Sequence, residues 1–112
     1  MRLAVIGSKE FRDFERLKSV LDKISGITVI VSGTAAGTDT LAARYALEHN
    51  LKLIEFPPDF EKYREKAKYV RDRQIVENCD QIIAFWDGKC EGTKYTMDYA
   101  EKSGMSVKAI EI

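Results

Sequence analysis

Short apolar runs alternate with helical patterns along the whole chain, and this alternation limits the fold more than any other feature. Five runs have the length and apolarity of strands, at residues 3–6, 27–31, 51–56, 81–86 and 107–112. Between them, apolar residues recur at helical spacing in segments 13–24, 38–49, 61–78 and 93–102. Strands that alternate with helices form a parallel sheet covered on both faces. We therefore predict an α/β fold of Rossmann type.

The distribution of apolar and charged residues among the strands predicts their order in the sheet. The first, second and fourth runs are almost entirely apolar, as central strands buried on both faces are. The third run contains Lys52 and Glu55, and the last contains Lys108 and Glu111, which suits the two edges. An open, five-stranded parallel sheet in the order 3-2-1-4-5 satisfies both observations, with a switch point between the first and fourth strands. We expect one domain over residues 1–112.

The charge balance and the length of the apolar runs argue against several classes of protein. The 112 residues include 18 basic and 18 acidic ones, so the formal net charge of zero gives no overall field for DNA or a membrane. No apolar run approaches the roughly 20 residues of a membrane span, and the first run is too short for a signal peptide. Two cysteines and one histidine are too few for a disulfide framework or a metal site. We expect a cytoplasmic protein with no membrane partner and no bound metal.

Three glycine-bearing loops follow predicted strands whose carboxyl ends share one edge of the sheet. They are residues 7–9, 32–39 and 87–93. Ligands of open parallel sheets bind at this edge, next to the switch point. The second and third loops directly precede helices, and a helix start holds anions through its free N–H groups and its dipole. Thr38 and Thr93 are also candidate N-caps of these helices. We predict that the two loops hold one phosphate group between them.

Several motifs of the chain together resemble a known family. They are Val5-Ile6-Gly7-Ser8-Lys9-Glu10-Phe11-Arg12-Asp13, Val31-Ser32-Gly33-x-x-x-Gly37-Thr38-Asp39, Phe56-Pro57-Pro58-Asp59-Phe60, Arg71-Asp72 and Ala84-Phe85-Trp86-Asp87-Gly88-Lys89-x-x-Gly92-Thr93. The set resembles the YspA-type branch of the SLOG superfamily over nearly the whole chain. That superfamily also takes in the DNA-processing protein Smf/DprA and the LOG phosphoribohydrolases. The resemblance implies a Rossmann-like fold that binds nucleotides or nucleotide-derived ligands.

The resemblance also implies which residues line the ligand site. They are Gly7, Ser8, Gly33, Gly37, Thr38, Asp39, Arg71, Asp87, Gly88, Gly92 and Thr93, and Lys9 joins them from the first loop. Two positions depart from the family pattern, because relatives usually carry glycine in place of Thr34 and asparagine in place of Asp72. Thr34 allows fewer backbone conformations in its loop than glycine does. The second places a negative charge beside Arg71, which weakens an anion site.

One further departure bears on catalysis. The LOG hydrolases carry a catalytic glutamate three residues after the threonine of the last Gly-Thr pair, and this chain has Thr96 there. A threonine cannot serve as the carboxylate that supports N-glycosidic cleavage. We therefore expect a sensor or sequestering module for a phosphate-bearing nucleotide. A hydrolase of the N-glycosidic or phosphate bond is the alternative, with Asp39, Asp87 or Asp98 as its carboxylate.

A second alternative is single-stranded nucleic-acid binding of the DprA kind. Segment 61–73 holds six basic residues against three acidic ones, which favours binding to phosphates. The simpler interpretation of such a segment is a solvent-exposed helix face with ion pairs. The neutral net charge argues against nucleic acid, since single strands are held in positive grooves with stacking aromatics. Relatives commonly dimerise, and an apolar helix face of this chain is compatible with a homodimer.

Overall fold

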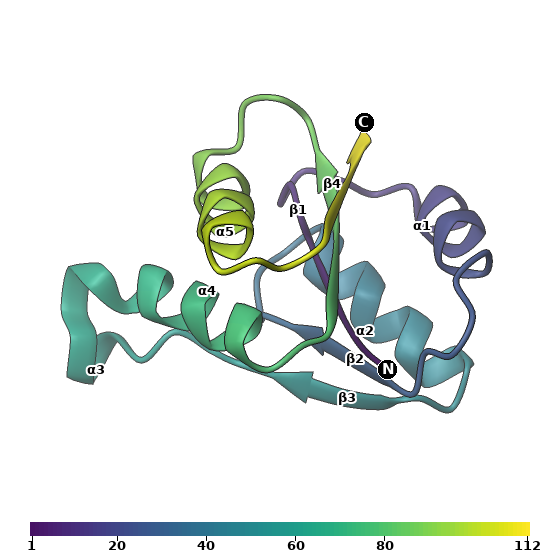
Figure 1. Cartoon of the computed structure of the whole chain (residues 1–112), viewed down its shortest axis with the longest axis horizontal. Helices are drawn as coiled ribbons and strands as arrows, with labels where there is room; N and C mark the ends of the chain where they lie inside the picture. The colour runs from purple at the N-terminus through teal and green to yellow at the C-terminus, as the bar shows by residue number, and fades with distance from the viewer.

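The computed structural model describes all of residues 1–112 as alternating strands and helices (Figure 1). The elements in chain order are β1 (Arg2–Gly7), α1 (Phe14–Leu21), β2 (Val29–Ser32), α2 (Thr38–Glu48), β3 (Lys52–Glu55), α3 (Phe60–Tyr63), a 3-10 turn (Arg64–Lys66), α4 (Ala67–Glu77), β4 (Gln81–Trp86), α5 (Glu91–Lys102) and β5 (Val107–Glu111). Each predicted strand is present, and each predicted helical segment contains a helix. None of the helices combines the length and the apolarity that a membrane crossing requires.

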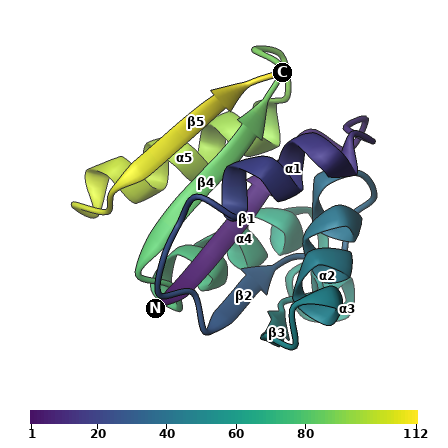
Figure 2. The ribbon, with the colours of Figure 1, turned by 90° about the vertical axis from the view of Figure 1, so that its right-hand side faces the viewer.

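The five strands form one parallel sheet in the order β3-β2-β1-β4-β5, which confirms the predicted order. Figure 2 shows the strands side by side. In the central strand β1, Leu3 pairs with Ile30 of β2 on one side and with Gln81 of β4 on the other. The carboxyl ends of β1, β2 and β4 therefore lie next to one another at the same edge of the sheet.

Two helices cover each face of the sheet (Figure 1). Leu3 and Val5 of β1 pack in the core cluster with α1 and α2, while Ala4 and Ile6 pack in the cluster with α4 and α5. All four side chains are buried, because alternate residues of a strand point to opposite faces and both faces are covered here. The core thus fixes the helix starts that follow β2 and β4 over the carboxyl edge.

The helix predicted over residues 61–78 is interrupted in the structure. Arg64 has a φ of 51°, a left-handed conformation that rarely suits a long side chain. It ends α3, whose N-cap is Asp59, and the 3-10 turn then leads into α4. In Figure 1, α3 lies beyond the N-terminal end of α4. The single-helix prediction was wrong because this segment contains no glycine or proline that would indicate the break.

Candidate functional site

A cavity of about 400 Å³ lies at the carboxyl edge of the sheet, and we call it the loop cavity. Four segments contribute to its wall: the loop after β1, the loop before α2, the loop before α5, and the stretch from the 3-10 turn into α4. The lining residues are Ile6, Gly7, Lys9, Ala35, Asp39, Glu65, Lys68, Tyr69, Arg71, Asp72, Ile75, Cys90, Glu91, Gly92, Thr93 and Thr96. The structure therefore brings the second and third glycine loops to one hollow.

Thr38 fastens the first loop to the second. Its backbone N–H and its hydroxyl both donate to the carbonyl oxygen of Ser8, at 3.1 and 2.8 Å. A Cβ on Gly37 would overlap the backbone of Lys9, and a Cβ on Gly7 would overlap the Phe85 carbonyl oxygen, so both glycines permit this close approach. The hydroxyl of Thr38 is completely buried in this contact, so it is not an N-cap and is not free for a ligand.

The N-terminus of α2 keeps unpartnered amide groups at the loop cavity. The N-cap is Gly37, with a φ of 73° and no side-chain cap. The N–H groups of Asp39 and Thr40 have no hydrogen-bond partner within the protein. Asp39 lines the loop cavity and Thr40 does not, so this helix start places one free N–H group and the positive end of its dipole beside the hollow.

The N-terminus of α5 is also uncapped by any side chain. The N-cap is Cys90 rather than Thr93, whose hydroxyl donates to the Cys90 Sγ at 3.2 Å. The first helical N–H group with a partner is that of Lys94, which donates to the Cys90 carbonyl oxygen. The N–H groups of Glu91, Gly92 and Thr93 have none. Two helix starts with unpartnered amides thus border the same cavity.

Arg71 of α4 lies over the end of β2, where its guanidinium borders the loop cavity. Its Nε donates to Asp72 Oδ1 at 2.8 Å, and the two terminal nitrogens make no hydrogen bond within the protein. A Cβ on Gly33 would come within 2.5 Å of Arg71 Nη1 and 2.8 Å of Asp39 Oδ2. The glycine therefore leaves room for both side chains, and the guanidinium keeps a two-nitrogen edge free for an anion.

The two carboxylates beside Arg71 are held in a poorly hydrated setting. Burial raises the pKa of Asp39 above its ordinary value, against the opposing effects of the Ala35 N–H and Arg71. Burial likewise raises the pKa of Asp72, again against Arg71. The hydroxyl of Ser32 is buried nearby and has no hydrogen-bond partner. Asp39 is thus a carboxyl group with weakened acidity at the wall of the cavity.

Asp87, by contrast, stabilises the turn in which it lies through its own hydrogen bonds. Its Oδ1 accepts from the N–H groups of Lys89 and Cys90, each at 2.8 Å, and its Oδ2 accepts from the Ser8 hydroxyl at 3.2 Å. The two amides hold the pKa of Asp87 below its ordinary value. It does not line the loop cavity, and neither does Asp98, which is exposed and paired with Lys94.

The predicted site residues therefore divide into two groups. Those that line the loop cavity are Gly7, Lys9, Asp39, Arg71, Gly92 and Thr93. Those that do not are Ser8, Gly33, Gly37, Thr38, Asp87 and Gly88, and all of them but the exposed Gly88 make the contacts that shape the surrounding loops. The absence of three or more clustered His, Cys, Asp or Glu residues leaves no candidate metal centre.

Sequence reasoning missed one wall of the cavity. Glu65, Lys68 and Tyr69 line it, next to Asp72 and Ile75. Positions 68, 69, 72 and 75 follow the spacing of one face of α4, and Glu65 lies in the 3-10 turn before it. The helical spacing of these positions relative to Arg71 and Asp72 was the sequence signal that could have identified them as lining residues.

Comparisons with known proteins agree with this architecture. A model of the YspA, cpYpsA-related SLOG family matches residues 1–63. The Gene 61 protein of Mycobacterium phage D29 is 28% identical over 116 residues, which cover 95% of this chain and 93% of that protein.

A solved structure gives the same picture of the fold. The X-ray structure of DNA processing protein A (DprA) from Streptococcus pneumoniae superposes with a TM-score of 0.83 at 22% identity, over 99% of this chain and 50% of that one. This chain thus spans half the length of that DprA chain, and the likeness is one of fold. With the family model matching more than half of its residues, the chain belongs to the YspA, cpYpsA-related SLOG family.

Proposed function

We propose that the chain binds a nucleotide or a nucleotide-derived ligand in the loop cavity, as a sensor or sequestering module. One observation carries the proposal: the unpartnered amides of two helix starts and the free edge of Arg71 border one hollow. Uncapped helix starts attract anions, and a guanidinium donates two parallel hydrogen bonds to a phosphate. A phosphate between α2 and α5 would satisfy all three groups.

The remaining charges of the lining suit a sugar attached to that phosphate. Three basic and four acidic side chains line the cavity. Because the acidic ones outnumber the basic ones, the cavity does not attract every anion. Carboxylates accept hydrogen bonds from ribose hydroxyls, as the acidic residue of dinucleotide-binding folds does. The lining therefore combines amide and guanidinium donors for a phosphate with carboxylates that can accept from sugar hydroxyls, which favours a phosphorylated sugar over inorganic phosphate.

The proposal is tested by calorimetry with AMP and ADP-ribose, using adenosine as the phosphate-free control. Both phosphate compounds should bind, and adenosine should bind at least about tenfold more weakly, because charge-assisted hydrogen bonds contribute roughly 1.5–3 kcal/mol. Arg71→Met should reduce this preference, because only the amides of the two helix starts then remain, and Arg71→Lys should reduce it less. Arg73→Met is the matched control, since Arg73 is exposed on the same helix, donates to the Tyr95 hydroxyl and lies outside the cavity. Equal binding of AMP and adenosine contradicts the proposal.

A hydrolase acting on the same ligand is the second candidate, and Asp39 is the observation that favours it. A half-buried carboxyl with a raised pKa at the wall of a ligand cavity suits a general acid or base. Thr96, at the position where the LOG hydrolases carry their catalytic glutamate, donates its hydroxyl to the Gly92 carbonyl oxygen at 3.0 Å. Incubation with nucleoside monophosphates followed by product analysis tests this candidate. Turnover that disappears in Asp39→Asn supports it, and no turnover at high protein concentration excludes it.

A further inference from the structure

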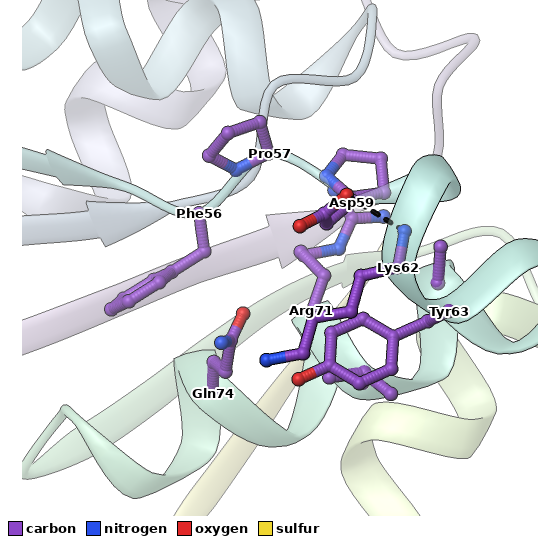
Figure 3. Close-up of a pocket in the computed structure, with 10 residues that line it drawn as sticks. Phe56, Pro57, Asp59, Lys62, Tyr63, Arg71 and Gln74 are labelled. Atoms are coloured by element: carbon purple, nitrogen blue, oxygen red, sulfur yellow. Dashed lines mark hydrogen bonds between the residues drawn. The ribbon is translucent and has the colours of Figure 1, made fainter.

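A second cavity, of about 480 Å³, shares Arg71 with the loop cavity (Figure 3). We call it the β3 cavity, because its wall begins at Phe56 and Pro57 directly after β3 and continues through α3 to α4. We propose that the β3 cavity holds the nucleobase of a nucleotide whose phosphate lies in the loop cavity. This inference rests on the proposed function and adds to it a base subsite.

The walls of the β3 cavity offer flat apolar surfaces. Figure 3 shows Phe56, Pro57 and Tyr63 around the hollow, and Lys62 Nζ lies 5.1 Å from the centre of the Tyr63 ring. Phe56 and Tyr63 are both partly exposed, so their rings are not fully covered by the protein. Aromatic rings stack on nucleobases without needing a particular base, because every base has a π-face. A planar aromatic guest therefore fits these walls better than a compact sugar or an aliphatic chain does.

The polar groups of the cavity match the edge of a base. The side-chain amide of Gln74 lines the hollow and has no hydrogen-bond partner within the protein. An amide of this kind both donates and accepts, which is how asparagine and glutamine recognise base edges. Asp59 is the one acidic side chain in the wall. Its Oδ1 already has a hydrogen-bond partner, because it caps α3 by accepting from the Lys62 N–H at 3.1 Å.

Arg71 connects the two cavities into one binding region. On α4, residues 67, 70 and 74 line the β3 cavity, while residues 68, 69, 72 and 75 line the loop cavity, and residue 71 lines both. Arg71 is therefore the one residue that the linings of the two cavities share. A nucleotide has its base and its phosphate joined by one ribose, so a phosphate on Arg71 brings its base within reach of the neighbouring hollow.

The test compares the four nucleoside 5′-monophosphates with ribose 5-phosphate, which has the phosphate and the sugar but no base. Calorimetry on the whole chain should show at least one nucleotide binding about tenfold or more above ribose 5-phosphate, as stacking on an aromatic ring predicts. Tyr63→Ala and Gln74→Leu should remove that advantage and leave the affinity for ribose 5-phosphate unchanged. Phe60→Ala is the matched control, since Phe60 is an exposed aromatic residue of the same helix α3 that lines neither cavity.

The possible outcomes distinguish a failure of the base subsite from a failure of the phosphate site. Ribose 5-phosphate binding on both variants shows that they are folded and that the phosphate site is intact. If all four nucleotides bind no better than ribose 5-phosphate, or if both variants keep the nucleotide advantage, the base subsite is overturned and the phosphate site stands. If neither ribose 5-phosphate nor any nucleotide binds, the proposed function itself is overturned.

Discussion

Arg71 and Asp72, adjacent in the sequence, are joined through their side chains by a hydrogen bond of 2.8 Å from Nε to Oδ1. Only 11% of the Arg71 side chain and 12% of the Asp72 side chain are exposed. The contact fixes the plane of the guanidinium over Gly33 and leaves its terminal nitrogens unpaired. It also places a negative charge next to the cation that we assign to the phosphate. Asp72 therefore orients Arg71 and opposes it at the same time.

Replacing Asp72 by asparagine should tighten the binding of AMP. In Asp72→Asn the amide oxygen can still accept from Arg71 Nε, so the orientation is kept while the negative charge is removed. We expect about a tenfold gain, because one charge near a phosphate at an effective dielectric constant of about 20 changes the interaction by roughly 1–2 kcal/mol. Calorimetry measures the gain, and Glu77→Gln on the exposed face of α4 is the control. A loss of affinity would show that Asp72 supports the ligand instead.

The pH dependence of stability should carry the signature of Asp39. Its pKa in the folded chain is raised above the ordinary value of 3.8, so on increasing pH the unfolded state loses this proton first. The free energy of unfolding should therefore fall as the pH rises from 3.8 through the folded pKa. Asp39→Asn removes this contribution, so its stability relative to the wild type should increase over that window and then level off.

Asp87 provides the internal comparison for that experiment. Its pKa is lowered from 3.8 by the amides of Lys89 and Cys90, so its contribution to stability is present above 3.8 and is lost as the pH falls through the folded pKa. Relative to wild type, Asp87→Asn should lose stability as the pH rises through that range, opposite in sign to Asp39→Asn. Thermal unfolding of the three proteins across the acid range measures both trends. Parallel trends in the two variants would contradict the assigned environments.

Two glycines of the site should respond to alanine in different ways. Gly37 combines a φ of 73° with a Cβ position that overlaps the Lys9 backbone, so Gly37→Ala should cost at least about 2 kcal/mol of stability. Gly92 has open space around its Cβ position and lies in the first turn of α5, so Gly92→Ala should fold as well as wild type. The added methyl group borders the loop cavity and should weaken AMP binding. Denaturant unfolding and calorimetry separate the two effects, and equal stability of both variants would contradict this assignment.

Thr38→Val should loosen the junction between the first two loops. The substitution keeps the shape of the buried side chain but removes the donor to the Ser8 carbonyl oxygen. That oxygen still accepts from the N–H groups of Phe11 and Thr38, so we expect a loss of about 1 kcal/mol, the net contribution of one hydrogen bond. Thr40→Val, at an exposed position of the same helix, should cost less. Denaturant unfolding compares the two, and an unchanged midpoint for Thr38→Val would contradict the role of this contact.

The fold could be predicted from local patterns because the sheet imposes a simple rule on its strands. Strands buried on both faces are apolar throughout, whereas β3 and β5 carry Lys52 and Lys108 at the two edges. This difference predicted the two edge strands, and the switch point of open α/β sheets supplied the order of the three strands between them. The break at Arg64 was not predictable in the same way, because a left-handed arginine leaves no mark in the hydrophobic pattern.

The loops of the site were predictable, but the role of each side chain was not. Sequence spacing showed that Thr38 and Asp87 lie beside glycines next to helix starts, which is where both caps and ligands occur. Only the packing of the first loop against the second shows that Thr38 is committed to Ser8. In the same way, the hydrogen bonds from Lys89 and Cys90 show that Asp87 serves its own turn. Partners distant in sequence decide these roles.

Nuclear magnetic resonance of the ¹⁵N-labelled chain tests the central claim most directly, during titration with ribose 5-phosphate. The amide signals of Asp39 at the start of α2 and of Gly92 and Thr93 at the start of α5 should move together along one saturation curve. The amide of Glu15 in α1, whose N-terminus is already capped by Asp13, should stay in place. Saturable binding that moves only one of the two helix starts, or neither, would contradict a phosphate held between them.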